Sequence, residues 1–256
     1  MNKLLFIIGL YATTVSSQII EKPIASIEYF TTINLHVEEL YNCKLIYNQN
    51  ESVFIWSKSG DESVKNSNGS FTKASHYDDQ TINYINFKDK TLDSQKFIYG
   101  KEAVHIEEDL PSLNWNITNE KKMIGSFETV KATVDFRGRN FSVWFSPELG
   151  HRVGPWKLNG LPGTILEAYD QAREIVFSMH KINYKPTTLT FEITGEKVNL
   201  EEYYQKEINY PFEMIKRLQA KAGRGSGIKI TAVNYNFLEK DYERLGKEVE
   251  SKIEGN

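Results

Sequence analysis

The sequence has a single cysteine, Cys43, in 256 residues, so neither an internal disulfide nor a cysteine-based zinc ribbon can form. Proline and glycine are also scarce, at 7 and 16 residues, which excludes a collagenous or low-complexity chain. Acidic and basic residues nearly balance, with a formal net charge of −3, so we expect no nucleic-acid partner. Hydrophobic residues make up 40% of the chain, which suits a folded domain rather than a disordered chain or an integral membrane protein.

The N-terminus has the layout of a secretory signal peptide. A basic start at Lys3 precedes an apolar run over residues 4–12, and small polar residues follow over 13–17. The apolar run is too short to cross a bilayer, which needs about 20 apolar residues. Val15 and Ser17 suit a cleavage site before Gln18. We therefore expect residues 1–17 to be a signal peptide. Residues 18–256 should form one β-rich domain, exported to the periplasm or an envelope face, or secreted.

Most of the remaining chain has the alternating pattern of half-buried β-strands. In residues 81–87 the apolar parity switches between Tyr84 and Ile85, which indicates a bulge or two buried faces. So many short strands predict a mainly β fold, with a curved or folded-over antiparallel sheet. The candidate strands are residues 27–35, 43–47, 53–56, 81–87, 97–99, 104–107, 113–117, 127–136, 141–145, 165–169, 173–184, 187–194 and 228–237.

One C-terminal stretch has the pattern of a helix. Asn199 is a good N-cap, and Glu202 stands at the capping-box position. Pro211 lacks the amide hydrogen that a helix interior needs, so we expect a broken helical segment, with helices over 200–209 and 211–222. The face expected to dock on the sheet carries Phe212, Ile215, Leu218 and Ala222.

Residues 154–163 (GPWKLNGLPG) form the most specific motif of the chain. Pro162 and Gly163 are the pair that a type II turn favours, because proline fixes φ and glycine accepts a positive φ. Leu161 and Trp156 would pack on the sheet beside this turn. The structural motif residues are Gly154, Pro155, Gly160, Leu161, Pro162 and Gly163.

The chain resembles the GLPGLI family, secreted or envelope proteins of Bacteroidetes-type bacteria with no established function. The resemblance is close over residues 113–170 and looser over 1–239. It is carried by the motif tract and by Trp115, residues 122–132, 135–139 and 143–145, and Glu148 before Gly154. Thr164, Ser126 and Thr129 depart from the family pattern, which favours Leu, Gly and Cys there. The resemblance implies a β-rich envelope protein that is accessory to outer-membrane transport or assembly.

Two groups of residues are candidates for binding. Arg137 and Arg139 flank a turn, and such converging donors could hold a carboxylate, a phosphate or a lipid head group, although charged turns are often simply solvated. Trp144, Trp156 and Leu161 could line an apolar groove, or they could be ordinary core residues. The partner would be an envelope protein or a lipid-like ligand.

Catalytic and metal-binding patterns are weak. The five histidines have no zinc-type spacing, and residues 76–79 (HYDD) are a poor match to a cation site. We expect no catalytic residue, cofactor or metal. Two function classes remain: a non-enzymatic envelope protein that binds a partner or apolar ligand on its sheet, or a hydrolase with a site near the Gly-Leu-Pro-Gly loop, where Glu148, Glu167 and Asp170 lie.

Overall fold

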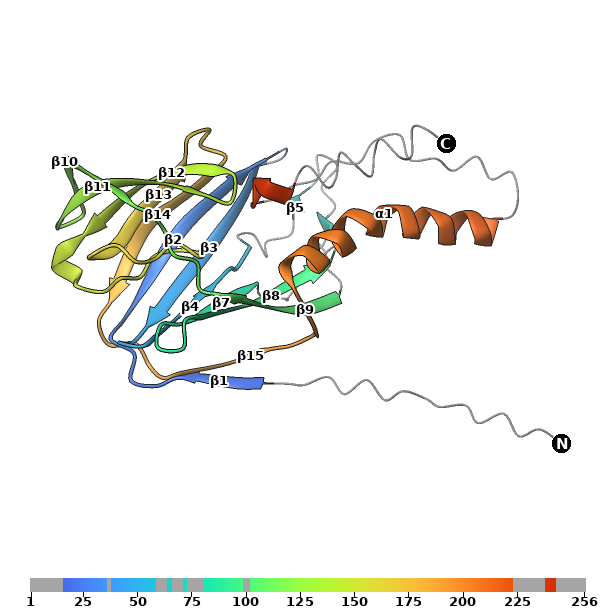
Figure 1. Cartoon of the computed structure of the whole chain (residues 1–256), viewed down its shortest axis with the longest axis horizontal. Coiled ribbons are helices and arrows are strands. Elements are labelled where there is room, and N and C mark those ends of the chain that lie inside the picture. The colour runs from blue at the N-terminus through green and yellow to red at the C-terminus, as the bar shows by residue number, and fades with distance from the viewer. Residues whose placement is uncertain are drawn as a thin grey trace.

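The structure, a computed structural model, describes residues 16–35, 38–58, 64–65, 71–72, 81–98, 102–222 and 238–242. Residues 1–15 of the expected signal peptide, the 76–79 tract and the expected strand at 228–237 lie outside the described residues. Within the described part the fold is mainly β, as predicted from the sequence, with one long helix near the C-terminus (Figure 1).

A curved sheet of twelve strands forms the body of the protein (Figure 1). Neighbouring strands are antiparallel except β16 and β9, which are parallel. The strand order is β10-β11-β12-β13-β14-β2-β3-β4-β7-β8-β9-β16. The bounds are β2 Ala25–Asn34, β3 Glu38–Tyr47, β4 Glu51–Ile55, β7 Ile82–Asn86, β8 Thr91–Ile98, β9 Glu102–Asp109, β10 Asn116–Ile124, β11 Phe127–Phe136, β12 Arg139–Ser146, β13 Thr164–Asp170, β14 Ile175–Asn183 and β16 Glu196–Val198.

Two short strand pairs accompany this sheet. β1 (Ser16–Ile20) pairs with β15 (Leu189–Ile193), and β5 (Val64–Lys65) pairs with β6 (Phe71–Thr72). The remaining elements are α1 (Leu200–Ala222) and two 3-10 turns, η1 (Pro147–Leu149) and η2 (Lys240–Tyr242). The predicted strand at 113–117 begins only at Asn116, and it continues to Ile124 through a charged stretch that the alternation did not indicate.

The concave face of the sheet holds the main core, which the 150–163 loop helps to fill. Trp156, Leu158 and Leu161 of this loop pack with strand residues such as Phe141 and Phe177. Tyr29 on β2 donates a hydrogen bond of 2.6 Å to the carbonyl of Ile165 on β13. The loop therefore replaces the second layer that an open sheet needs to bury its apolar face.

The opposite face is also buried in part, because the β1–β15 pair contributes to a second cluster there. Ile20 and Phe191 of this pair join Val53, Ile82 and Tyr84 in that cluster. Four of the five β7 residues are consequently buried, and the pairings of β7 contain no register shift. The sequence left two alternatives for residues 81–87, a bulge or two buried faces. The structure shows the second, because both faces of this strand are buried.

The helix differs from the sequence prediction in one respect, since α1 runs continuously from Leu200 to Ala222 through Pro211. The predicted break is wrong. Proline removes one helical hydrogen bond, but the residues that follow it, including Glu213, Met214 and Lys216, are strong helix formers that carry the helix onward.

The docked face of α1 was also predicted wrongly. Tyr203, Tyr204 and Ile208 of the first turns are buried, in a cluster with strands β8 and β9. Leu218, by contrast, is 43% exposed, and the far half of the helix extends away from the sheet (Figure 1). The charged side chains around Leu218 favour water over the sheet, so among the described residues only the N-terminal half of α1 packs on the strands.

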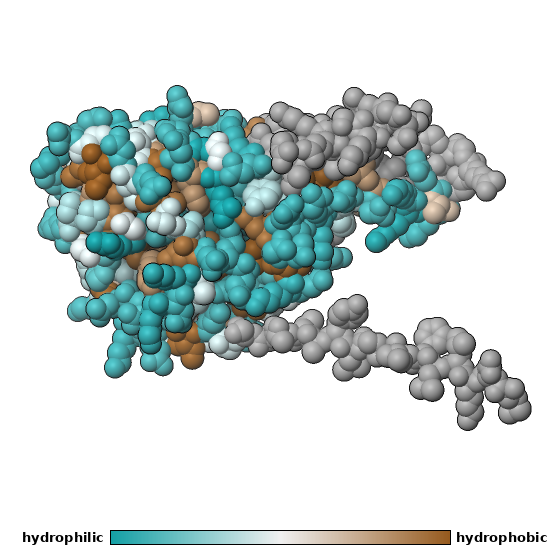
Figure 2. All heavy atoms as spheres, in the orientation of Figure 1, coloured by the Kyte–Doolittle hydropathy of each residue, from teal (hydrophilic) through white to brown (hydrophobic). Residues whose placement is uncertain are grey.

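The described helices include none with the length and apolar character that a membrane crossing requires. The face seen in Figure 2 is mainly hydrophilic, with apolar residues gathered in separate patches over the body.

Candidate functional site

The Gly-Leu-Pro-Gly loop is part of the core rather than a rim around a groove. Trp156 is 2% exposed and lies 5.5 Å, centroid to centroid, from the ring of Phe136. Leu161 is 1% exposed. A ligand could reach either side chain only by displacing core residues. The loop therefore positions its neighbours, of which the most unusual is the fully buried Lys157.

The turn at the end of this loop is tighter than the predicted type II turn. The amide of Gly163 donates to the carbonyl of Leu161 at 2.8 Å, which closes a three-residue turn around Pro162. Glycine is required at 163 by a close approach: an added Cβ would lie 2.3 Å from the carbonyl oxygen of Ser146. Gly160 has φ +93, a positive value that glycine accepts readily.

Gly154 and Pro155 open the loop under a similar constraint. A Cβ on Gly154 would lie 2.7 Å from both the Ile165 side chain and the Leu158 carbonyl oxygen. The carbonyl of Pro155 accepts a hydrogen bond of 3.1 Å from the Leu158 amide. These two residues therefore set the local turn that buries Trp156 and Lys157.

Trp144 lies on β12 but does not belong to the main core cluster. The ammonium of Lys122 lies 4.5 Å from the Trp144 ring and forms an ion pair of 2.8 Å with Glu167. Trp144 is thus separated from Trp156 and Leu161, and the three predicted binding residues do not form one site.

Arg139 is a buried structural cation. One guanidinium nitrogen bonds to Asp170 at 2.7 Å and to Glu174 at 2.6 Å, and Nε donates to the carbonyl of Leu238 at 2.7 Å. The side chain of Arg139 is 1% exposed. The Arg139 guanidinium holds the pKa of the Glu174 carboxyl below its usual value, with help from Lys240.

Arg137 and Gly138 form the two-residue turn between β11 and β12, and both have positive φ, at 52° and 72°. That combination marks a type I′ hairpin turn. The guanidinium of Arg137 pairs with Glu108 of β9, and its Nε lies 3.7 Å from Glu239. The anion site predicted at this turn therefore faces two carboxylates of the chain itself, those of Glu108 and Glu239.

Arg137 and Glu108 belong to a buried charged cluster, which we call the cradle. Lys157 pairs with Glu108 and, at 2.7 Å, with Glu239. The ammonium of Lys96 lies 3.6 Å from Oε2 of Glu239. The same oxygen accepts a hydrogen bond from the hydroxyl of Tyr204. The cradle is defined as Lys96, Glu108, Arg137, Lys157 and Tyr204, and Glu239 is its occupant.

The electrostatics of the cradle favour an anion at the position of Glu239. Without Glu239 the three cations Lys96, Arg137 and Lys157 would face Glu108 inside the cradle, with Glu207 acting on Lys96 from α1, so an empty cradle would hold excess buried positive charge. Burial alone raises the pKa of Glu239, but Lys157 and Lys96 outweigh it and hold that pKa well below its usual value. Burial lowers the pKa of Lys96, and burial with Glu239 raises the pKa of Tyr204.

The occupant comes from residues 238–242, which we call the C-terminal segment. Besides Glu239, the segment places the ring of Tyr242 on Tyr204, with centroids 4.1 Å apart and 18° between planes. The amide of Lys240 donates to the carbonyl of Arg137 at 2.9 Å. Gly138 makes room for this segment, because a Cβ there would lie 2.9 Å from atoms of Lys240 and Asp241.

Sequence reasoning identified only Arg137 among the residues of the cradle. Lys157 lies inside the recognised motif, but nothing in its neighbours distinguishes a buried lysine from a solvated one. Glu239 begins a charged stretch of sequence that carries no motif. A partial signal existed, because Leu238 and Tyr242 flank Glu239 with apolar surface.

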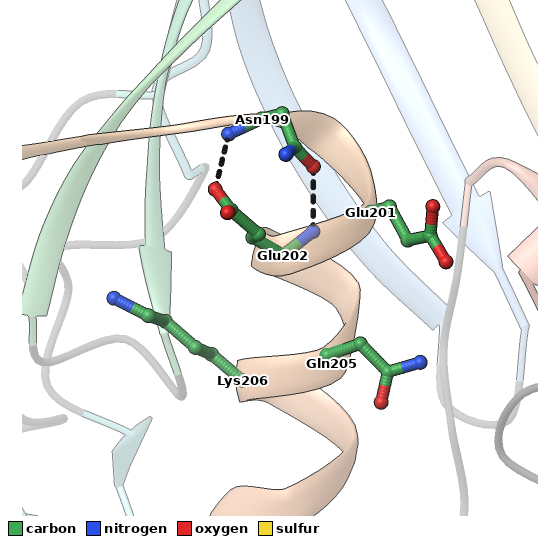
Figure 3. A pocket seen from close by; sticks show the side chains of 5 residues that line it. All are labelled: Asn199, Glu201, Glu202, Gln205 and Lys206. Carbon is green, nitrogen blue, oxygen red and sulfur yellow. Dashed lines mark hydrogen bonds between the residues drawn. The ribbon is translucent and has the colours of Figure 1, made fainter.

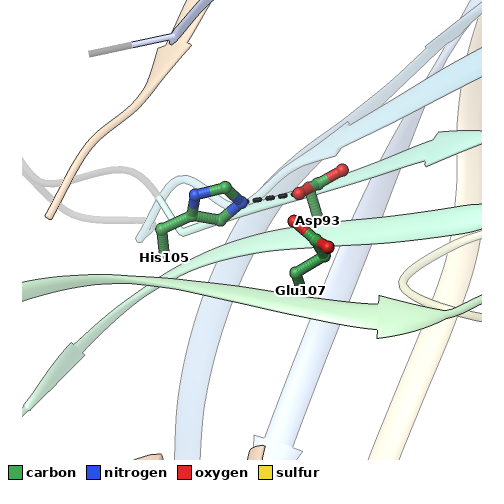
Figure 4. A group of neighbouring side chains, drawn as sticks. All are labelled: Asp93, His105 and Glu107. Atoms are coloured by element: carbon green, nitrogen blue, oxygen red, sulfur yellow. Dashed lines mark hydrogen bonds and ion pairs between the residues drawn. The ribbon is translucent and has the colours of Figure 1, made fainter. Parts of the chain in front are cut away.

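A second group of titratable residues lies near the edge of the sheet (Figure 4). Asp93 of β8 and His105 and Glu107 of β9 offer ligand atoms within 4.8 Å of one another. One nitrogen and two carboxylates would suit a divalent transition metal. His105 is already paired with Asp93, and Glu107 with Lys197. These pairs give the group a structural role without a metal. The His-x-Glu spacing on one strand face was its only sequence signal.

The start of α1 forms a shallow depression lined by residues of the helix itself (Figure 3). The predicted capping box is confirmed: the Asn199 side chain accepts from the Glu202 amide at 2.9 Å, and Glu202 accepts from the Asn199 amide at 2.8 Å. Because capping occupies these polar groups, the depression is a feature of helix initiation.

Two of the three carboxylates near the Gly-Leu-Pro-Gly loop, Glu167 and Asp170, are held in ion pairs. Glu167 pairs with Lys122, and Asp170 pairs with Arg139. Glu148 is exposed on η1. In this arrangement neither Glu167 nor Asp170 is available as the free acid or base of a hydrolase.

Comparisons with known proteins leave the function open. No protein-family model matches the sequence, and no curated protein does. The structure is similar to that of PNGF-II in its C2 crystal form, with 16% identity, a TM-score of 0.49, and coverage of 72% of this chain and 32% of that one. For the P21 form the values are 18%, 0.44, 64% and 28%. The chain thus spans less than a third of PNGF-II.

An uncharacterized conserved protein from Thermus thermophilus is also similar, with 7% identity and a TM-score of 0.35, covering 68% of this chain and 90% of that one. Likenesses at this level carry no argument about activity.

Proposed function

We propose that this chain is an exported, non-enzymatic binding protein of the GLPGLI type, and that its recognition site is the cradle. Its ligand in this proposal is a carboxylate-bearing group of an envelope partner. One observation carries the proposal: the carboxylate of Glu239 is fully buried among Lys96, Arg137 and Lys157, and it is supplied by a segment remote in sequence from all three.

The chemistry of the cradle suits binding rather than catalysis. Its cations are directed at an anion, and Glu108 balances part of their charge. Lysine and arginine together hold a carboxylate through charge-assisted hydrogen bonds, which are about twice as strong as neutral ones. Tyr204 adds a hydroxyl donor to the same oxygen pair. No group in the cradle is arranged as a nucleophile with an adjacent base.

The cellular location is a separate part of the proposal. It depends on the signal-peptide pattern of residues 1–17. An accessory role in outer-membrane transport or assembly follows from the family resemblance and from export together. The lipid-like ligand considered from the sequence has less support, because Trp156 and Leu161 are buried in the core.

Rescue of a truncated side chain tests the cradle directly. In the Glu239→Ala variant of the full chain, acetate or propionate should occupy the vacated position and raise the melting temperature saturably at pH 7. At ten times its dissociation constant, a free carboxylate adds about 1.4 kcal/mol of stability. Sodium chloride at equal ionic strength should not reproduce the effect.

The matched control is Glu128→Ala, which removes an exposed carboxylate paired with Lys121. Acetate should leave this variant and the unmodified protein unchanged. A melting temperature of Glu239→Ala that responds equally to chloride, or to neither anion, would show that the cradle does not accept a free carboxylate.

A further inference from the structure

The C-terminal segment occupies the cradle chiefly through groups that another polypeptide could supply. Its contacts with the cradle and the adjoining hairpin turn are made by the carboxylate of Glu239, the ring of Tyr242 and the amide of Lys240. Outside the cradle, Leu238 accepts from Arg139 and Lys240 pairs with Glu174. A side-chain carboxylate, an aromatic ring three residues later and a backbone amide between them are all common in proteins. The contacts of the C-terminal segment therefore serve as a model for the way in which the cradle would hold a peptide ligand.

The segment leaves one donor of the cradle unsatisfied. Among the described residues, the buried Nε of Arg137 has no hydrogen-bond partner, and the nearest Glu239 oxygen is 3.7 Å away. An N–H group buried without an acceptor costs about 1–3 kcal/mol. A carboxylate placed slightly closer to the Arg137 turn would satisfy this donor, so Glu239 is not the best occupant that the cradle allows.

We propose that the C-terminal segment is an internal occupant that an acidic, aromatic segment of a partner protein replaces. This inference rests on the proposed function and assigns the ligand class: a polypeptide with a carboxylate residue followed three positions later by an aromatic residue. Displacement would uncover the cradle and the ring of Tyr204 together, because Tyr242 leaves with Glu239.

The contacts favour a polypeptide over a lipid head group or free phosphate. The carbonyl of Arg137 accepts an amide N–H, which a peptide backbone provides at the spacing that Lys240 shows. The face of Tyr204 takes a parallel ring, which a phosphate or a head group lacks. Gly138 lets the backbone of the segment pass directly over the hairpin turn.

The C-terminal segment competes with a partner for the cradle, and this competition sets the affinity that the partner needs. A segment attached to the same chain competes intramolecularly, at an effective concentration that reaches the millimolar range. A partner segment present below that concentration must therefore bind the empty cradle more tightly than the C-terminal segment would as a free peptide. The internal occupant thus discriminates against weak acidic peptides.

Peptide binding to the full-length chain tests the inference. The probe is the peptide of residues 238–242, acetylated and amidated, and its control carries glutamine in place of the glutamate. The receptor is the Glu239→Gln/Tyr242→Ala variant, whose own segment has lost both side-chain anchors. By calorimetry, we expect the glutamate peptide to bind this variant at least ten-fold more tightly than it binds the unmodified protein. The glutamine peptide should bind neither.

A second measurement uses the unmodified protein and does not depend on the variant folding. Glutamate peptide in excess over the effective concentration of the internal segment, about the millimolar range, should increase hydrogen exchange across residues 238–242, where the Lys240 amide is bonded to Arg137. Unchanged exchange, or no binding to the folded double variant, overturns the inference. If acetate still rescues Glu239→Ala in that case, the cradle binds free carboxylates and the proposed function stands. If acetate also fails, both proposals are wrong.

Discussion

The ammonium of Lys157 lies 2.7 Å from the carboxylate of Glu239, and both side chains are fully buried although 82 residues separate them in sequence. Burying two charges is favourable only when their geometry and further hydrogen bonds offset the loss of hydration. Glu108, Lys96 and Tyr204 provide those further contacts. The pair therefore joins the loop of the main core to the C-terminal segment.

We predict that Glu239→Gln destabilises the protein by about 3–5 kcal/mol, because it leaves buried cations without their counter-charge. Urea unfolding followed by tryptophan fluorescence measures the loss. The control Glu128→Gln disrupts a pair whose side chains are 61% and 57% exposed, and it should change stability by less than about 0.5 kcal/mol. Equal effects of the two variants would contradict a special role for the cradle.

Acid should destabilise the protein through Glu239. Its folded pKa lies below the unfolded value of 4.5, so its contribution to stability is complete above that pH and is lost as the pH falls toward the folded pKa. Between pH 5 and pH 3 the melting temperature of the unmodified protein should fall more steeply than that of Glu239→Gln. Parallel curves would contradict the assignment. The groups that face Glu239 are Lys96, Glu108, Arg137, Lys157, Tyr203, Tyr204 and Tyr242, with Glu207 acting on Lys96.

Gly163→Ala should cost about 1–3 kcal/mol, because the new Cβ would lie 2.3 Å from the Ser146 carbonyl oxygen and the backbone must shift. Gly150→Ala provides the matched comparison. Gly150 has φ +68 but no atom within 4 Å of the added Cβ, so only the conformational cost of about 1 kcal/mol applies. Thermal unfolding of both variants distinguishes close packing from backbone preference. A milder effect at 163 than at 150 would contradict the close-approach explanation.

The exported protein should begin at Gln18. Cleavage there would remove Ser16 and Ser17 from β1 and leave the pairing of Gln18 with Phe191, Ile19 with Thr190 and Ile20 with Leu189. N-terminal sequencing of protein recovered from the envelope or the medium decides the matter. Recovery of the chain from the cytoplasm with Met1 intact would contradict export.

Local features of the fold were predictable because the interacting residues are neighbours in sequence. The capping box depends on Asn199 and Glu202, three positions apart, and the strand alternation depends on adjacent residues. The continuous helix was missed because Pro211 has a strong local effect, which the helix formers after it outweigh. The three-residue turn at Pro162 was missed because proline and glycine suit several tight turns.

The cradle was largely beyond sequence reasoning because its members come from β8, β9, a hairpin turn, a loop and α1, and its occupant comes from the C-terminal segment. Arg137 was identified as an anion donor from its turn, yet its partners Glu108 and Glu239 have no sequence relationship to it. Buried charges resemble solvated ones in a sequence, since only tertiary packing removes the water around them. Trp156 and Leu161 show the same ambiguity for apolar residues, which serve equally in a core or a groove.

The place of β2 in the sheet has a consequence for how the chain folds. β2 lies between β3, its neighbour in sequence, and β14, so that Ser26 pairs with Asn183 and Ile33 with Ile175. Such distant pairings make folding slow, because a long loop must close before they form. A nascent chain that ends before residue 175 exposes one full edge of β2, which is a site for unwanted association. The final third of the polypeptide therefore controls when the first third is protected, and a chaperone would have to shield that edge until then.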